Sequence, residues 1–177
     1  MNLAKRRDYV AEGAASRPPI VVDYDLQFRQ PQLGAALAYW RSCCGDRAMP
    51  ARSDLDPVDM RQFLASVLLA EVVAGGRGPE IRIRLAGTEI EAIFGPITGK
   101  PLAEALPADM VARWALLAQT VLAARGPVRF VTRIAYRGQE FVTAEVLAAP
   151  LSAHDIDIDM MFAVVLFTTD RDALADT

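Results

Sequence analysis

Glu145 and Thr132 are the polar residues best suited to contact a bound molecule. Each lies in a segment that is otherwise typical of a half-buried strand, 141–150 and 128–136 respectively. The residues between these segments, 137–140, are typical of a tight hairpin turn. Pairing across that turn places Thr132 opposite Glu145 on one face of the sheet. Because a carboxylate on an apolar face is costly unless it is paired or meets a ligand, we expect both residues to supply polar contacts inside a pocket.

The register of this hairpin decides which residues share the pocket face. The predicted pairs are Tyr136–Phe141, Ile134–Thr143, Thr132–Glu145 and Phe130–Leu147. A bulge would shift the register and turn Glu145 away from the pocket. Glu145 would then face solvent or pair with an arginine, and the sequence leaves both interpretations open.

A strand that turns directly into a short helix, at 80–99, is the predicted wall of this pocket. Its first half alternates apolar and charged side chains, which is the period of a half-buried strand. Gly87 follows, and Thr88 with Glu91 three residues later matches a capping box at the start of a helix. A Gly-Pro pair then ends the helix.

The remaining elements follow from hydrophobic periodicity and turn signals. We predict helices at 31–44, 57–64 and 107–125, and strands at 66–73, 80–86, 128–136, 141–150 and 159–168. The short connections make the sheet antiparallel. The predicted fold class is α+β, with a five-stranded antiparallel sheet, a helical block between strands 2 and 3, and an N-terminal flanking helix. The long helix, which carries Trp114 on its inner side, is expected to lie over the concave face of the sheet.

Composition and charge exclude several classes of function. The 177 residues are 53% hydrophobic and 23% charged, which suits one domain with a buried core. The net charge of -3 provides no global basic field for nucleic acid. We expect no membrane insertion, because the longest apolar run, 160–167, is far shorter than the ~20 residues that span a bilayer. Cys43 and Cys44 are adjacent and cannot form a disulfide framework, so we expect a cytoplasmic protein with reduced, structural cysteines.

Several segments of the chain resemble a bacterial PAS-like family formerly described as a domain of unknown function. These segments are AYWRSCCGDRAMPARSDLDPVDM, IRIRLAGTEIEAIFG, TGKPL and APLS. The first is the most specific, because four of its residues fall at the spacing typical of the family: Trp40, Pro50, Asp56 and Pro57. The resemblance covers residues 32–170, and the later segments share mainly pattern. We therefore divide the chain into a partly ordered N-terminal arm (1–30), a PAS-like domain (31–170) and a C-terminal tail (171–177).

The resemblance implies a sensory or docking module. PAS domains are usually dimeric, and many carry an output domain; we expect none here, because 177 residues leave no room for one beside the PAS-like domain. We therefore expect a homodimer and a separate signalling protein as partner. Leu33, Leu37 and Trp40 form one stripe of the first predicted helix, and they are the candidates for packing on the sheet or on a dimer partner.

The two cofactors considered for a PAS domain do not suit these residues. A light-sensing flavin needs a cysteine within the helical block, and both cysteines lie upstream of it. Haem needs a ligand such as a histidine on the long helix, but the only histidine, His154, lies in a loop. The acidic segment 154–159 lacks the glycine and glutamate of a calcium-binding loop, so we interpret it as a solvated turn without a metal. No known cofactor is expected, and an unidentified small molecule stays open.

Three hypotheses for function remain. The first is a sensory or regulatory module that binds a small metabolite or a protein, without catalysis. The second is a protein–protein dimerisation adaptor whose pocket is filled by its own side chains. The third, an isomerase-like enzyme, is disfavoured because the sequence offers no convincing acid–base pair. The candidate pocket residues are Ile83, Leu85, Thr88, Trp114, Phe130, Thr132, Ile134, Thr143 and Glu145.

Overall fold

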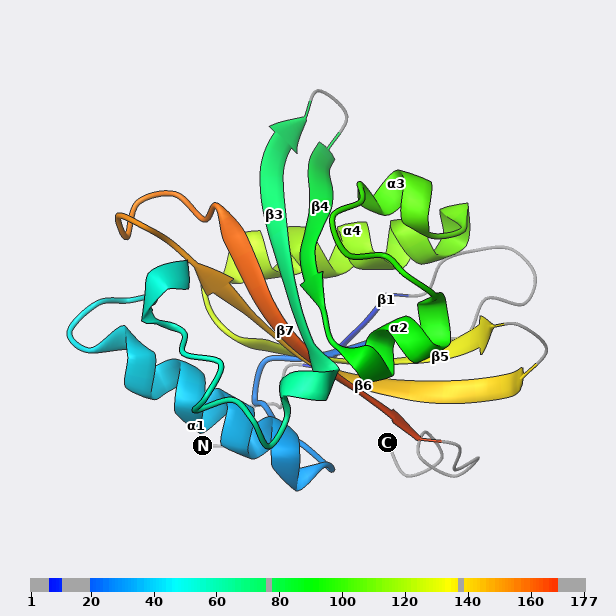
Figure 1. Ribbon diagram of the computed structural model, residues 1–177, viewed down its shortest axis with the longest axis horizontal. Coiled ribbons are helices and arrows are strands. Elements are labelled where there is room, and N and C mark those ends of the chain that lie inside the picture. Colours follow the sequence, from blue (N-terminus) through cyan, green and yellow to red (C-terminus); the bar gives the residue numbers. More distant parts are fainter. Residues whose placement is uncertain (1–6, 11–19, 76–77, 137–138, 169–177) are drawn as a thin grey trace.

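A curved antiparallel sheet with helices on both faces forms the body of the protein (Figure 1). The computed structural model describes residues 7–10, 20–75, 78–136 and 139–168. The strands are β1 (Arg7–Val10), β2 (Ile20–Asp23), β3 (Val67–Gly75), β4 (Gly78–Ala86), β5 (Val128–Tyr136), β6 (Gln139–Leu151) and β7 (Met160–Thr168). The helices are α1 (Pro31–Cys44), α2 (Thr88–Phe94), α3 (Leu102–Ala105) and α4 (Ala108–Ala124), with short 3-10 helices at Arg52–Asp54 and Leu64–Ser66.

The sheet has more strands than the sequence predicts. Its order is β1-β2-β5-β6-β7-β3-β4, and every neighbouring pair is antiparallel. The prediction of an α+β fold with an antiparallel sheet is confirmed, but the number five is wrong, because the described part of the sheet has seven strands. The two additional strands come from the N-terminal arm. The apolar, β-branched residues of β2 pair with the edge of β5, with Ile20 opposite Thr132 and Asp23 opposite Arg129.

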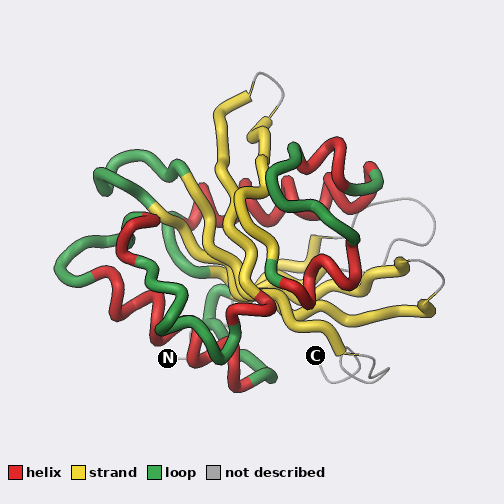
Figure 2. The backbone as a smooth tube through the Cα atoms, viewed as in Figure 1, coloured by secondary structure: helices red, strands yellow, loops and turns green. Residues whose placement is uncertain are grey.

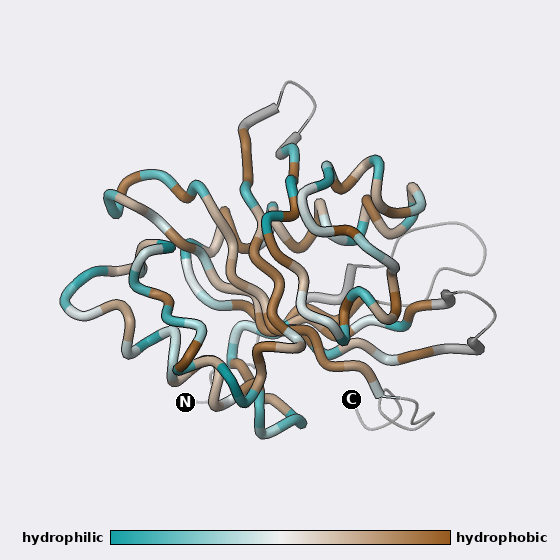
Figure 3. Tube along the Cα trace, in the orientation of Figure 1, coloured by the Kyte–Doolittle hydropathy of each residue, from teal (hydrophilic) through white to brown (hydrophobic). Residues whose placement is uncertain are grey.

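Each face of the sheet has its own hydrophobic core. Helices α2, α3 and α4 pack on one face, and α1 with the segment 49–63 packs on the other (Figures 1 and 2). Successive residues of β3 alternate between the two cores, so Val67 contacts the α1 side and Leu68 the α4 side. Because both faces are covered, the central strands read as nearly continuous hydrophobic segments (Figure 3).

Two local predictions are wrong. Residues 57–63 form hydrogen-bonded turns instead of a helix. The capping box at Thr88 is not formed, because Gly87 is the N-cap residue and α2 has no side-chain cap. The carboxylate of Glu91 instead accepts hydrogen bonds from the backbone N–H groups of Ile97 (3.1 Å) and Thr98 (3.0 Å). Glu91 therefore fixes the loop after α2 rather than the start of the helix.

Among the residues that the structure describes, no helix is long and apolar enough to cross a bilayer.

The outer edge of β4 is covered by a loop. Ile83 exchanges backbone hydrogen bonds with the loop 97–101, accepting from Gly99 N–H and donating to the carbonyl of Lys100. Further along, Ala86 N–H donates to the Thr98 hydroxyl at 3.0 Å. This loop blunts an edge that would otherwise present unpaired backbone groups.

Candidate functional site: a cavity beneath helix α4

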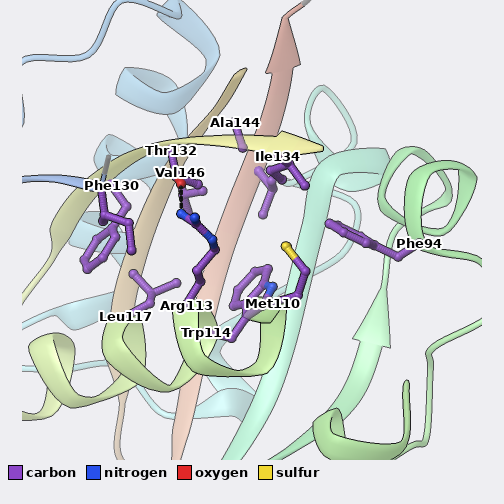
Figure 4. Close-up of a pocket in the computed structure, with 12 residues that line it drawn as sticks. Phe94, Met110, Arg113, Trp114, Leu117, Phe130, Thr132, Ile134, Ala144 and Val146 are labelled. Carbon is purple, nitrogen blue, oxygen red and sulfur yellow. Dashed lines mark hydrogen bonds between the residues drawn. The ribbon is translucent and has the colours of Figure 1, made fainter. Parts of the chain in front are cut away.

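A small cavity lies between α4 and the sheet (Figure 4). It measures about 30 Å³ as the space open to the centre of a water-sized sphere. Twelve residues from β2, α2, α4, β5, β6 and β7 line it: Ile20, Phe94, Met110, Arg113, Trp114, Leu117, Phe130, Thr132, Ile134, Ala144, Val146 and Val165. The cavity therefore contacts the helices α2 and α4, the strands β5, β6 and β7, and the strand β2 of the N-terminal arm.

The polar groups of the cavity are concentrated in one pair of residues. Arg113 and Thr132 are the lining residues that carry a charge or a hydroxyl group. Arg113 extends from α4 toward β5, and its Nη1 donates a hydrogen bond to the Thr132 Oγ1 at 2.6 Å (Figure 4). The remaining lining is hydrocarbon, aromatic rings, one thioether and the indole N–H of Trp114. The site thus combines an apolar interior with a cationic hydrogen-bond donor.

Four of the predicted pocket residues line the cavity. They are Trp114, Phe130, Thr132 and Ile134. Trp114 lies on the inner stripe of α4, and the other three alternate along β5 on the face toward that helix. Ile83 is fully buried in the same core but does not line the cavity. The structure therefore brings together the part of the predicted site that lies on α4 and β5.

The prediction that Thr143 and Glu145 enter this pocket is wrong. The register between β5 and β6 is shifted at an irregularity between Ile134 and Tyr136. Thr132 consequently lies opposite Ala144, and Glu145 lies opposite Val131. A shift of one residue turns every side chain of a strand to the other face. Thr143 and Glu145 are therefore buried away from the cavity, as the alternative interpretation with a bulge anticipates.

Glu145 is held by an arginine and by the start of α1. Its Oε1 lies 2.6 Å from Arg129 Nε, and only 5% of Glu145 is exposed. The two carboxylate oxygens also accept the backbone N–H groups of Arg29 (2.9 Å) and Gln30 (3.1 Å). Gln30 is the N-cap of α1, so the carboxylate lies where the helix dipole favours negative charge. Arg129 Nη1 reaches Asp23 at 3.2 Å, which links β2 to the same network.

Leu85 and Thr88 do not line the cavity beneath α4 either. The pairing of β3 with β4 is irregular between Leu69 and Ala70, so Arg84 is left without a partner in the ladder. This bulge turns Leu85 to the opposite face, where it packs against the core on the α1 side. Thr88 is exposed at the start of α2. Both residues line a separate surface depression near Arg61.

The predicted stripe of α1 packs on the chain's own sheet. Leu33, Leu37 and Trp40 are at most 7% exposed and belong to the core between α1 and the sheet. The indole N–H of Trp40 donates to the carbonyl of Pro150 at 3.0 Å. Of the two interpretations left open by the sequence, the structure shows packing on the sheet. A homodimer stays a prediction.

Sequence reasoning missed Arg113, although a signal for it exists. Arg113 is three residues after Met110 and four before Leu117, and both neighbours lie on the buried stripe of α4. Residues at this spacing share one face of a helix. A charged side chain is unusual on a core-facing stripe, but the long side chain of Arg113 extends along the apolar lining to reach Thr132. Of the other lining residues not named by the sequence, Ala144 and Val146 are on β6 and face the cavity because of the register shift. The rest come from β2, α2, α4 and β7: Ile20, Phe94, Met110, Leu117 and Val165.

The burial of Cys44 supports a structural role for this cysteine. Burial raises the pKa of the Cys44 thiol, which keeps it protonated and unreactive. Burial also raises the pKa of Tyr39 to about 12, aided by a hydrogen bond with Cys43. Neither cysteine lines the cavity. Among the described residues, no group of three or more His, Cys, Asp and Glu side chains is arranged to hold a metal ion.

The comparison with known families gives a clear assignment. A family model described as the PAS domain matches residues 28–165, which is more than half of the chain. No curated protein matches the chain. The matched region begins just before α1 and ends within β7, so it includes the helical block, the strands β3 to β6 and most of β7. The protein therefore belongs to the PAS domain family.

Proposed function

We propose that this protein is a regulatory PAS module that senses a small molecule in the cavity beneath α4 and catalyses no reaction. The observation that supports the proposal is the lining of the cavity, which includes residues of α4, of α2 and of β2, a strand of the N-terminal arm. An occupant of the cavity would touch Trp114 on the helix and Ile20 on the arm at once. Binding could thereby change how the arm is held.

The absence of catalysis is part of the same proposal. General acid–base chemistry needs a group that gains and loses a proton near the working pH. The polar groups of the cavity lining belong to Arg113, Thr132 and the indole of Trp114, whose N–H does not titrate. A guanidinium stays protonated and a hydroxyl stays neutral throughout the physiological range. The lining therefore suits binding better than proton transfer.

A signalling protein is the proposed receiver of the response. The N-terminal arm joins the sheet through β2, whose Asp23 bonds to Arg129 and whose Ile20 lines the cavity. A change at the cavity would reach the arm without crossing the whole domain. The face of the sheet beneath α1 is already covered, so a partner or a second copy would contact another surface. We place the protein in the cytoplasm because its adjacent cysteines are free.

The second candidate function, a protein–protein adaptor with a filled pocket, is favoured by the size of the cavity. Pockets for drug-sized ligands enclose about 300–1,000 Å³. The space here is about 30 Å³, because side chains such as Trp114, Met110 and Arg113 occupy most of the interval between helix and sheet. An adaptor would need no ligand at all.

Native mass spectrometry on protein purified from its own host distinguishes the two candidates. The sensory proposal predicts that a fraction of the protein retains a small additional mass. The matched control is Ala144→Val, since Ala144 lines the cavity and two added methyl groups fill part of it. The additional mass should be lost in this variant. Bare wild-type protein under conditions that preserve weak complexes would contradict the sensory proposal and favour the adaptor.

A further inference from the structure

A groove on the surface opens onto the core of the α1 side, beside the region that α1 covers. It lies between the turns at 57–63, the first half of β3 and the end of β4, and it measures about 460 Å³ as the space open to the centre of a water-sized sphere. Its apolar lining includes Val67 and Leu69, which are buried, and Leu64 and Leu85, which remain partly exposed. The groove therefore has room for apolar side chains of a docked segment.

Two arginines make the groove cationic. Arg52 and Arg61 belong to its lining, and none of the described residues that line it is acidic. Arg61 is exposed and has no ion pair or hydrogen bond within the described part of the chain. Arg52 uses Nη1 to donate to the carbonyl of Leu55 at 3.2 Å, which engages one of its five N–H donors. Asp54, two residues from Arg52, is instead paired with Arg47. A segment that carries a carboxylate beside an apolar side chain is complementary to this groove.

The loop between β6 and β7 carries this complementary chemistry. Ile156 is 72% exposed, more than any other large apolar side chain in the described ranges. Asp157 follows it, is exposed, and has no hydrogen bond or ion pair among the described residues. Residues 154–159 include three aspartates, so the loop is acidic. An exposed apolar side chain and a carboxylate without a partner thus stand next to each other.

The loop is held in one shape, although its apolar side chain is exposed. The carboxylate of Asp155 accepts the backbone N–H of Met49 at 3.2 Å. Arg125 Nη2 donates to the carbonyl of Ile156 at 2.8 Å. Asp155 itself adopts a φ of 60°, in the left-handed region that aspartate tolerates better than most residues. A loop that is already ordered loses less conformational entropy when it docks than a flexible one does.

The loop and the groove are neighbours on the surface, connected by residues 50–52 (Figure 1). The N–H of Ser152, at the start of the loop, donates to the carbonyl of Pro50 at 3.0 Å. Arg52, two residues further along the chain, lines the groove. In a two-fold dimer each copy presents the same patch, so residue i of one copy contacts residue j of the other and the reverse. A two-fold axis beside this patch would place the loop of each copy in the groove of the other, and every contact would be made twice.

We propose that the groove binds the 154–159 loop of a second copy of this chain, in a two-fold dimer. Ile156 enters the apolar part of the groove beside Leu85, and Asp157 pairs with Arg61. This inference goes beyond the proposed function and does not depend on what the cavity beneath α4 binds. Since small interfaces are typical of transient contacts, the dimer should be weak and should dissociate on dilution.

The test measures dimerisation of the full chain by sedimentation velocity over a series of protein concentrations. Ile156→Ala removes most of the apolar side chain, and Arg61→Glu reverses a charge of the groove. Asp157→Arg reverses a charge of the loop, and the double variant Arg61→Glu with Asp157→Arg exchanges the two charges. Arg41→Glu is the matched control, because Arg41 is exposed on α1 and belongs to neither the groove nor the loop. All substituted side chains are exposed, so each variant should fold, which thermal unfolding checks.

The wild type and the Arg41→Glu control should form dimers with similar dissociation constants. Ile156→Ala and each single charge reversal should weaken dimerisation by about 10- to 100-fold, since every contact is made twice. The double variant should regain most of the lost affinity, because opposite charges again meet across the interface. Added salt should weaken the wild-type dimer, because exposed ion pairs are screened.

Three results would overturn this inference. If the wild type stays monomeric at every concentration, a second copy is not the occupant of the groove. If the dimer withstands Ile156→Ala and Arg61→Glu unchanged, the two copies meet at another surface. If the double variant dimerises as weakly as the single reversals, Asp157 does not pair with Arg61. None of these results changes the mass retained by the cavity, so the sensory proposal is tested separately.

Discussion

Glu145 and Arg129 form an ion pair inside the protein, with 2.6 Å between Oε1 and Nε and about 6% of each side chain exposed. Arg129 also contacts Asp23 on β2 at 3.2 Å, so one guanidinium serves two buried carboxylates. Asp23 in turn accepts the backbone N–H groups of Asp25 and Gln27. The network fastens the entire connection from β2 to α1 onto the sheet. This role explains why charged groups are retained at a position where the sequence suggests a ligand contact.

Replacing Arg129 with methionine should destabilise the protein strongly. The variant leaves Asp23 and Glu145 buried near each other without a cation. Removing one partner of a buried ion pair costs about 3–5 kcal/mol. Urea unfolding at pH 7 would measure the loss.

The matched control is Arg84→Met. Arg84 pairs with Glu71 at 3.0 Å, but 54% of the Arg84 side chain is exposed. Exposed ion pairs contribute about 0–1 kcal/mol, so this variant should unfold almost like the wild type. Equal losses in the two variants would show that the Arg129 network has no special role.

Gly87 should not tolerate a side chain, although its φ of -67° suits any residue. A Cβ added there would lie 2.1 Å from the carbonyl oxygen of Ala65, which belongs to the backbone and cannot turn aside. The N–H of Gly87 bonds to the carbonyl of Val67 at 2.8 Å, which fixes this close approach. We expect Gly87→Ala to lower the free energy of unfolding by about 2–3 kcal/mol.

Gly34→Ala should have the opposite effect on the free energy of unfolding, which urea unfolding would measure for both glycine variants. Gly34 lies inside α1, and nothing is within 4 Å of an added Cβ. Alanine is favoured over glycine in a helix by about 0.5–1 kcal/mol, so this variant should be slightly more stable than the wild type. A loss of stability at Gly34, or none at Gly87, would contradict the steric argument.

The sequence predicts the elements of this fold better than their registers. Alternating or continuous apolar segments bounded by turn signals identify the strands β3 to β7, and the inner stripe of α4 identifies Trp114. The two irregularities, near Ala70 and after Ile134, depend on how neighbouring strands pair across the sheet. No local pattern encodes such a shift. The predicted positions of Leu85 and Glu145 are wrong for this reason.

The arm and the cavity show a second limit of sequence reasoning. β2 is only four residues long, and its apolar patch becomes a strand because β5 offers a free edge. Arg113 carries a charge that is unusual at a core position. Its place in the cavity lining becomes apparent only from its hydrogen bond to Thr132. Both features are settled by tertiary contacts that outweigh local preference.

Glu91 should make stability depend on pH in the acid range. The backbone N–H of Thr98 is the main cause, and with the Thr98 hydroxyl and the N–H of Ile97 it holds the pKa of Glu91 below its ordinary value of 4.5. Since the unfolded chain binds this proton more readily, the stabilisation is present above pH 4.5 and is lost as the pH falls below it.

The test compares wild type with Glu91→Gln by urea unfolding from pH 7 into the acid range. The wild type should be the more stable protein at pH 7, and the difference should shrink as the pH falls below 4.5. A difference that stays constant over this range would show that the ionised form of Glu91 has no preferred interaction with the 97–98 backbone.

Two alanines on β6 test whether the cavity beneath α4 accommodates added side-chain atoms without loss of stability. Ala144 and Ala148 are both buried on the face toward α4, but only Ala144 lines the cavity. Valine has the same strand preference at either position, so the comparison isolates packing. Ala148→Val should overpack the core and cost about 1–3 kcal/mol. Ala144→Val should cost less than about 1 kcal/mol or stabilise the protein, because its methyl groups enter the cavity. Thermal unfolding would measure both, and equal losses would mean that the side chains already fill the interval between helix and sheet.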